Sequence, residues 1–147
     1  MTRGRVLHAG DGVGPVLRLD DALSFWGGLD PATGTIIDRA HPQVGESIAG
    51  AIVAMPGSRG SSGTPGVLGE ALRRGVGPAA IIVTKPDVNL LAGAIVAGAL
   101  YDVPCPIVLV TIDEFAALRT GDRVSIAAGG EIRDEGRRPE SDPTAAV

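Results

Sequence analysis

The sequence predicts an α/β fold in which a β-rich first half is followed by alternating strands and helices. Short apolar runs separated by turn residues fill positions 5–55, and apolar residues at helical spacing alternate with short buried runs after that. The chain has 147 residues, of which 44% are hydrophobic, so it suits one domain with a sizeable core. We therefore expect a single β/β/α domain over residues 1–130.

The first half is expected to consist of short strands. Residues 5–9 and 15–19 are apolar-rich runs. Residues 23–28 and 35–37 flank the sequence Asp-Pro-Ala-Thr-Gly, whose early proline and late glycine predict the turn of a β-hairpin. Residues 51–55 form a further apolar strand.

A helix is expected to begin at Pro65. Proline is favoured at the first helical position, Thr64 is a suitable N-cap, and Gly75 is a suitable C-terminal stop. The apolar residues of this segment fall on one helical face: Val67, Leu68, Ala71 and Leu72.

Two more buried strands are expected at residues 79–83 and 106–110, with a helix between them. This helix carries the strongest periodic signal of the chain, in which apolar residues recur at helical spacing: Val88, Leu91, Ala92, Ile95, Val96 and Ala99. A short helix at 114–118 and a strand at 123–127 complete the domain. Residues 131–147 are charged and nearly free of apolar side chains, which predicts a disordered tail.

Composition argues against several classes of partner. The net charge is −4, no basic stripe is present and aromatic residues make up 3%, so nucleic acid is not expected as a ligand. The longest apolar segment, 88–100, is too short to span a bilayer, and no signal peptide is seen at the N-terminus. We expect a cytoplasmic protein with no membrane contact.

Metal binding by this chain is not expected either. Cys105 is the only cysteine, so an intrachain disulfide is impossible and an iron–sulfur cluster would lack ligands. His8 and His41 show no metal-ligand spacing. His41 is interpreted as a loop residue, with a place at an interface or pocket as the alternative. Phe25 and Trp26 are expected in the core or at an interface.

The segment 56–66, Pro-Gly-Ser-Arg-Gly-Ser-Ser-Gly-Thr-Pro-Gly, is the main candidate site. It follows a strand and precedes a helix, so its glycines and the helix N-terminus offer N–H groups beside hydroxyls and a guanidinium. That chemistry suits a carboxylate, a phosphate or a serine alkoxide. A plain glycine- and serine-rich surface loop explains the same residues. The segment matches neither a P-loop nor a nucleophile elbow.

Three segments together resemble the small subunit of the aconitase X family. They are Leu-Ser-Phe-Trp-Gly-Gly-Leu-Asp-Pro-Ala-Thr-Gly at 23–34, Arg-Gly-Ser-Ser at 59–62 with the following Val-Leu, and Gly-Ala-Ile-Val-Ala at 93–97 leading to Tyr-Asp-Val-Pro. Their order and spacing cover residues 4–128. The resemblance implies an aconitase-like swivelling β/β/α domain that closes over a large subunit carrying an iron–sulfur cluster and most of the substrate pocket.

The resemblance also implies roles for the loop. The first serine after Arg-Gly is the family's proton acceptor, which places that role on Ser61, and Arg59, Gly60 and Ser62 are the expected substrate-binding residues. The substrate is a small hydroxy acid. The serine pair is more similar to the cis-3-hydroxy-L-proline branch, and mevalonate 5-phosphate is the alternative.

One departure from the family pattern affects this expectation. Related chains continue with Ser-Gly-Ser, whereas this chain has Gly-Thr-Pro at 63–65, which changes the hydroxyls available to a substrate. Three functions therefore stay open. They are a dehydratase small subunit that is inactive without its large subunit, a non-catalytic swivel module, and an independent anion-binding module.

Overall fold

The fold is built around one mixed sheet of eight strands in the order β1-β10-β9-β3-β6-β7-β8-β2. The computed structural model describes residues 2–60 and 62–137. A two-stranded hairpin, β4-β5, lies apart from the sheet. The elements in chain order are β1 (Thr2–Arg3), β2 (Arg5–His8), β3 (Gly12–Arg18), β4 (Leu29–Asp30), β5 (Thr35–Ile36), β6 (Ile52–Met55), α1 (Thr64–Arg73), β7 (Ala80–Val83), α2 (Val88–Tyr101), β8 (Ile107–Leu109), α3 (Ile112–Ala117), β9 (Asp122–Ile126) and β10 (Glu131–Arg137).

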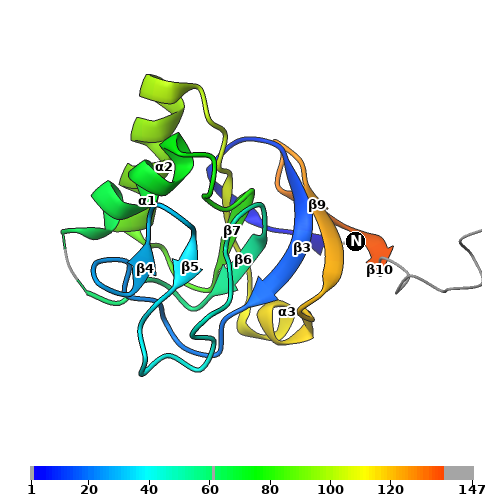
Figure 1. Cartoon of the computed structure of the whole chain (residues 1–147). Coiled ribbons are helices and arrows are strands. Elements are labelled where there is room, and N and C mark those ends of the chain that lie inside the picture. The colour runs from blue at the N-terminus through cyan, green and yellow to red at the C-terminus, as the bar shows by residue number, and fades with distance from the viewer. Residues whose placement is uncertain (1, 61, 138–147) are drawn as a thin grey trace, which may run out of the picture.

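Strands β3, β6, β7 and β8 are parallel and form the centre of the sheet. Parallel neighbours require crossover connections, which α1 and α2 supply. The two helices pack against each other on one side of β6 and β7, and β9 and β10 curve away on the other side (Figure 1). The expected α/β architecture is confirmed, with the β-rich layer and the helical layer on opposite faces of the parallel strands.

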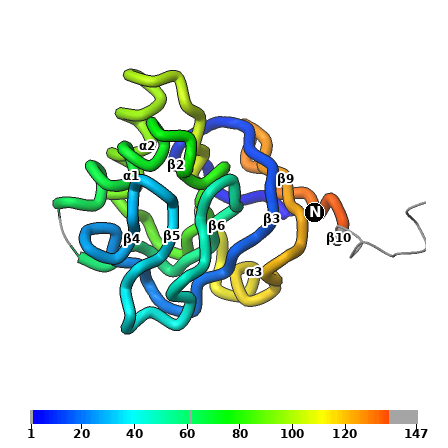
Figure 2. The backbone as a smooth tube through the Cα atoms, in the orientation of Figure 1, coloured from blue at the N-terminus to red at the C-terminus, as the bar shows by residue number. Residues whose placement is uncertain are grey.

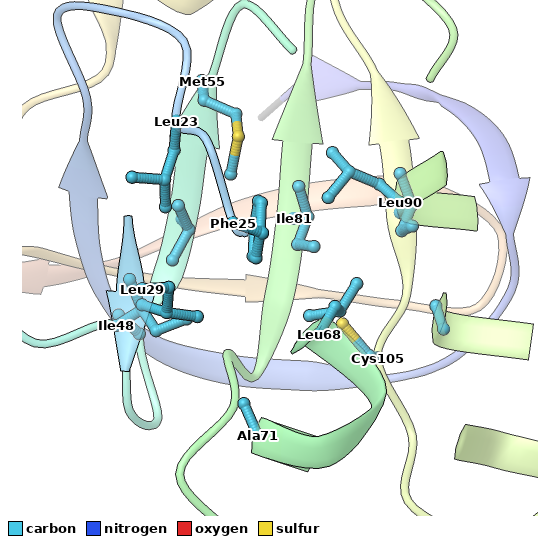
Figure 3. Close-up of a cluster of buried hydrophobic side chains, with 14 of the residues drawn as sticks. Leu23, Phe25, Leu29, Ile48, Met55, Leu68, Ala71, Ile81, Leu90 and Cys105 are labelled. Carbon is cyan, nitrogen blue, oxygen red and sulfur yellow. The ribbon is translucent and has the colours of Figure 1, made fainter. Parts of the chain in front are cut away.

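The central strands are buried on both faces, which explains why their sequences lack polar–apolar alternation. Alternate residues of β6 and β7 pack under α1 and α2: Val53, Met55, Ile81 and Val83. The residues between them pack toward β9 and β10: Ile52, Ala54, Ala80 and Ile82. Figure 3 shows the first cluster, in which Phe25 and Leu23 from the segment after β3 join Met55 and Ile81 of the sheet.

The long connection from β3 to β6 contains the expected hairpin (Figure 2). Its turn closes as predicted, with Gly34 N–H donating to the Asp30 carbonyl at 2.8 Å and Gly34 in the left-handed region at φ +77°. The first strand of the hairpin is shorter than expected and begins later, at Leu29. Gly27, also at φ +77°, interrupts the extended backbone, so residues 23–28 do not form a regular strand.

The expected tail was placed too early. Residues 131–137 form β10, which pairs with β9 at the sheet edge. Ile132 is buried in the core, while Arg133, Asp134 and Glu135 are exposed. An edge strand tolerates such charges, so the charged composition did not exclude a strand. Residues 138–147 of the expected tail lie outside the described residues.

Helix α2 forms where expected, but most of its periodic residues do not lie on its buried side. Val88, Ile95, Val96 and Ala99 are exposed. The buried side consists of Leu90, Gly93, Ala94 and Ala97. The small residues let α1 approach: a Cβ added to Gly93 would lie 3.1 Å from both Leu68 Cδ2 and the Pro65 carbonyl oxygen. Close helix packing therefore selects the small face over the bulky one. Within the described ranges, no helix combines the length and hydropathy needed to cross a membrane.

Candidate active-site loop at the carboxyl edge of the sheet

The candidate loop lies where parallel strand β6 ends and α1 begins. Because β3, β6 and β7 are parallel, their carboxyl ends meet at one edge of the sheet. The loop is therefore flanked by the segment that follows β3 and by the segment 84–87 that follows β7. This position suits a ligand site in an open α/β sheet.

A carboxylate after β7 fixes the start of the loop. Asp87 Oδ2 accepts hydrogen bonds from the Ser58 backbone N–H at 2.6 Å and from the Ser58 hydroxyl at 2.7 Å. Its other oxygen, Oδ1, accepts from Leu90 N–H at 3.0 Å and caps α2. The Asp87 side chain thus joins Ser58 of the loop to the first turn of α2, which begins 30 residues after Ser58.

The segment after β3 supports the loop from the opposite side. Leu23 forms an isolated parallel bridge with Ser58, and the Arg59 N–H donates to the Leu23 carbonyl at 2.9 Å. Further along, Trp26 lies against Gly63, where an added Cβ would stand 3.0 Å from the Trp26 Cβ and 3.2 Å from Cε3. The two most distinctive sequence segments therefore lie side by side.

The two neighbouring aromatic residues have different environments. Phe25 is 1% exposed and belongs to the core, whereas Trp26 is 70% exposed. The core role is confirmed for Phe25 alone. Trp26 instead presents a large apolar surface beside the loop.

The predicted substrate-binding residues are all at the surface. Arg59, Gly60 and Ser62 are exposed, and Gly60 adopts φ +96°, a conformation that favours glycine. Ser61, the expected proton acceptor, lies outside the described residues. The structure thus brings the three binding candidates to one exposed edge, and the role of Ser61 stays a prediction.

The N-terminus of α1 is directed toward this loop without the expected cap. The N-cap is Gly63, not Thr64, and the first turn contains no acidic side chain. Thr64 instead occupies the first turn, is 1% exposed, and its hydroxyl has no hydrogen-bond partner among the described residues. With no carboxylate in that turn, the positive end of the helix dipole remains available to an anion at the loop.

Sequence reasoning missed three residues at this site: Ser58 as an anchor, Asp87 as its partner, and Lys85, whose side chain crosses the loop. A signal existed for Asp87, because an aspartate just before an apolar helix is an N-cap candidate. No local pattern predicts that its other oxygen binds Ser58.

His41 is structural in this fold. It is 5% exposed, its Nδ1 accepts from the Gln43 N–H at 3.0 Å, and its Nε2 lies 3.1 Å from the Asp21 carbonyl oxygen. An accepting Nδ1 and a carbonyl at Nε2 assign a neutral imidazole with the proton on Nε2. The interpretation as a loop histidine agrees with these contacts.

The donor set of this chain does not suit a metal cluster. Cys105 is fully buried, and burial raises the pKa of its thiol to about 12, which disfavours the thiolate that a cluster needs. Across residues 2–60 and 62–137, no group of three or more His, Cys, Asp or Glu side chains is placed to hold a metal ion.

Arg59, Gly60 and Ser62 of the candidate loop are exposed. Three surface hollows lie elsewhere, around α3, β9 and β10, and residues such as Val16, Leu118 and Ser125 line them. None of these three hollows includes Ser58, Arg59, Gly60 or Ser62. Because Arg59, Gly60 and Ser62 are exposed, a second surface over the loop would be needed to exclude water from a substrate bound to them.

Comparisons with known proteins agree with the fold. Residues 1–134 match the family model of the aconitase X swivel domain. A solved aconitase X structure from Thermococcus kodakaraensis superposes with a TM-score of 0.79 at 32% identity, covering 90% of this chain and 95% of that one. The solution structure of a UPF0107 protein gives the same TM-score at 33% identity, covering 90% and 97% of the two chains.

The similar curated proteins fall into two groups. Cis-3-hydroxy-L-proline dehydratase of Pseudomonas aeruginosa is 44% identical over 77% of this chain, and the enzyme of that name from Hypocrea jecorina is 35% identical over 97%. The chain spans only 20% and 24% of their respective lengths. The phosphomevalonate dehydratase small subunit of Methanopyrus kandleri is 37% identical over 80% of this chain and 83% of its own length.

The family model thus covers residues 1–134, and the relatives and solved structures named here match at identities above 30%. The chain belongs to the aconitase X family and folds as its swivel domain.

Proposed function

We propose that this chain is the small subunit of a two-subunit aconitase X-type dehydratase and donates Ser61 to an active site shared with a large subunit. The observation that carries the proposal is the half-built site. Ser58 anchors the loop to Asp87, yet Arg59, Gly60 and Ser62 lie exposed on an open edge. A second protein surface against this edge would complete a closed pocket and exclude water from it.

The proposed reaction eliminates water from a hydroxy acid. Ser61 accepts the proton from the carbon next to the carboxyl group, and the electron pair of that C–H bond forms the new C=C bond as the C–O bond on the adjacent carbon breaks. The leaving hydroxide takes up one proton and departs as water, which balances the proton accepted by Ser61. A serine hydroxyl is a poor base, and it can act as one only where positive groups stabilise its alkoxide. Arg59 and the N-terminus of α1 supply such groups. Arg59, Gly60 and Ser62 bind the substrate in this proposal.

We assign the iron–sulfur cluster expected of such an enzyme to the large subunit. The buried Cys105 and the donor set described above do not fit a cluster on this chain. No step assigned to the small subunit depends on the cluster. We further propose a cytoplasmic enzyme with no nucleic-acid or membrane partner, which is compatible with a single free cysteine.

Two substrates are candidates. Cis-3-hydroxy-L-proline is the leading one, since the Ser61–Ser62 pair resembles that branch and relatives at 35% and 44% identity carry that substrate in their name. Mevalonate 5-phosphate is the second, supported by relatives named phosphomevalonate dehydratase small subunit, of which the chain covers 83% in one case.

The test is reconstitution. The purified chain is mixed with a purified large subunit, each substrate is added, and mass spectrometry follows the conversion to a product lighter by one water. We expect turnover of one substrate by the mixture and none by either subunit alone. Full activity of the large subunit by itself would favour a non-catalytic swivel module. Binding of a free anion by the isolated chain, with no turnover in the mixture, would favour an anion-binding module.

A further inference from the structure

Lys85 is the only lysine among the 13 Lys and Arg residues of the chain, since every other one is arginine. It follows β7 at the carboxyl edge of the sheet, in the connection that leads to Asp87 and α2. A chain that uses arginine at every other cationic position has its one lysine beside the candidate loop.

The lysine side chain lies across the backbone of Gly57. A Cβ added to Gly57 would stand 3.2 Å from Lys85 Cε, 3.8 Å from its Cγ and 3.4 Å from Asp87 Oδ2. Gly57 is buried and does not adopt a positive φ. Glycine is therefore favoured at this position because there is little room for a Cβ, and not because of the backbone conformation. The missing Cβ leaves a channel for a narrow aliphatic stem. A planar guanidinium is broader than an ammonium group, which gives a physical reason for lysine at this position.

The ammonium group has no carboxylate partner in the described part of the chain. The ion pairs found there join Arg3 to Glu131, and Arg73 and Arg74 to Glu70. The nearest carboxylate in the chain order, Asp87, already accepts three hydrogen bonds from Ser58 and Leu90. Arg59, two residues after Gly57, likewise has no ion pair among those residues.

Two unpaired cations thus stand at one loop of a protein whose net charge is −4. The exposed end of Lys85 keeps its three donors available to an anion.

We propose that Lys85 is a substrate-binding residue that binds an anionic oxygen group of the substrate, a carboxylate or a phosphate, at the start of the loop beside Gly57. This inference rests on the proposed function, because the substrate is that of the dehydratase. Arg59 and Lys85 together provide two positive charges, whereas the sequence pattern pointed to Arg59 alone.

The single lysine allows a test that does not depend on turnover. The reconstituted complex is treated with an amine-acylating reagent, and mass spectrometry follows the modification of the small-subunit peptide that contains Lys85. We expect phosphate or acetate to slow this modification more than chloride at equal ionic strength. Protection by phosphate identifies a phosphate-binding lysine, and protection by acetate identifies a carboxylate-binding one. Equal rates in all three salts would overturn the proposal, because screening alone would then account for any effect.

Kinetics provide the second measurement. Lys85→Met keeps the length of the stem and removes the charge. We expect KM to rise by roughly 10- to 100-fold, the loss expected for a charge-assisted hydrogen bond, with a smaller change in kcat. Lys85→Arg should recover only part of this loss. Arg133→Met, an exposed cation on edge strand β10, is the matched control and should leave KM unchanged.

The failure of this inference is distinguishable from failure of the proposed function. A complex that turns over substrate, shows no anion protection and keeps its KM in Lys85→Met would overturn the role of Lys85 alone. A complex without dehydratase activity would contradict the proposed function. Anion protection of Lys85 would then still establish an anion site at the loop.

Discussion

The carboxylate of Asp87 binds Ser58 through both the backbone N–H, at 2.6 Å, and the hydroxyl, at 2.7 Å. The same carboxylate caps α2 through Leu90 N–H. This one residue therefore couples the geometry of the candidate loop to the stability of a helix that packs on the sheet.

Asp87→Ala should lower the free energy of unfolding by about 1–3 kcal/mol, because it removes an N-cap and leaves the Ser58 donors without a charged acceptor. Urea denaturation measures the loss, and hydrogen exchange of the peptide spanning 56–66 should become faster in the folded state. Thr111→Ala is the matched control, since it removes the N-cap of α3 on another part of the molecule. Thr111→Ala should lower the free energy of unfolding by a similar amount and leave the hydrogen exchange of residues 56–66 unchanged. Equal effects of both variants on the loop would contradict the anchoring role.

Trp26 is the only tryptophan of the chain and lies against Gly63 with 70% of its surface exposed. We expect the large subunit to cover it on docking at this edge, since exposed tryptophans are enriched in interfaces. A chain labelled with 5-fluorotryptophan should therefore show a changed fluorine resonance in the complex. As a control, Phe115→Trp in a Trp26→Phe background places the label on α3. A shift at α3 and none at position 26 would mean that docking uses another face.

Thr64 carries a buried hydroxyl without a hydrogen-bond partner among the described residues. Thr64→Val has nearly the same shape and removes this group, so the free energy of unfolding should stay the same or rise by up to about 1 kcal/mol. Thr120→Val is the contrast, because the Thr120 hydroxyl accepts from the Arg18 N–H at 3.0 Å. The free energy of unfolding of Thr120→Val should be lower by about 0.5–1.5 kcal/mol. A clear loss in Thr64→Val would show that its hydroxyl is bonded in solution.

Burial raises the pKa of Cys105 from its ordinary value of 9.0 to about 12. The unfolded chain then loses the thiol proton before the folded chain does, so the resulting stability is complete below pH 9 and is lost as the pH rises toward 12. Urea midpoints between pH 7 and pH 10 should fall more steeply above pH 9 for the native chain than for Cys105→Ala. Thiol reagents should react with Cys105 only on unfolding. Rapid labelling of the folded protein would contradict the buried environment.

Much of the fold could be predicted because its signals are local. The helix after the candidate loop was located by Pro65 and Gly75, and the hairpin turn was located by the proline and glycine around Thr33. Such residues act through their own backbone preferences, so no distant contact is needed to interpret them.

Other features depend on contacts that periodicity does not encode. Helix α2 is apolar on nearly every side, so its pattern could not distinguish the bulky face around Ile95 from the small face around Gly93. The face around Gly93 is buried because α1 packs closely against it. Among residues 131–136 of strand β10, Ile132 is the one buried side chain, and pairing with β9 outweighs the charge of the strand.

The site was predicted in part for the same reason. Glycines and hydroxyls around Arg59 were visible in one continuous segment, and resemblance to a family suggested a role for Ser61. Lys85 and Asp87 enter the site from a different strand, so only the parallel arrangement of β6 and β7 brings them to the loop.

The most direct test of the account is the turnover of Ser61→Ala in the complex reconstituted with a large subunit. We predict a loss of at least roughly 100-fold in kcat, as expected for removing a positioned acid–base group, with folding and subunit affinity unchanged. Ser62→Ala should lose less, because its proposed role is a hydrogen bond to the substrate. Near-normal turnover by Ser61→Ala would contradict the account, and loss of turnover in Ser62→Ala alone would move the proton acceptor to Ser62.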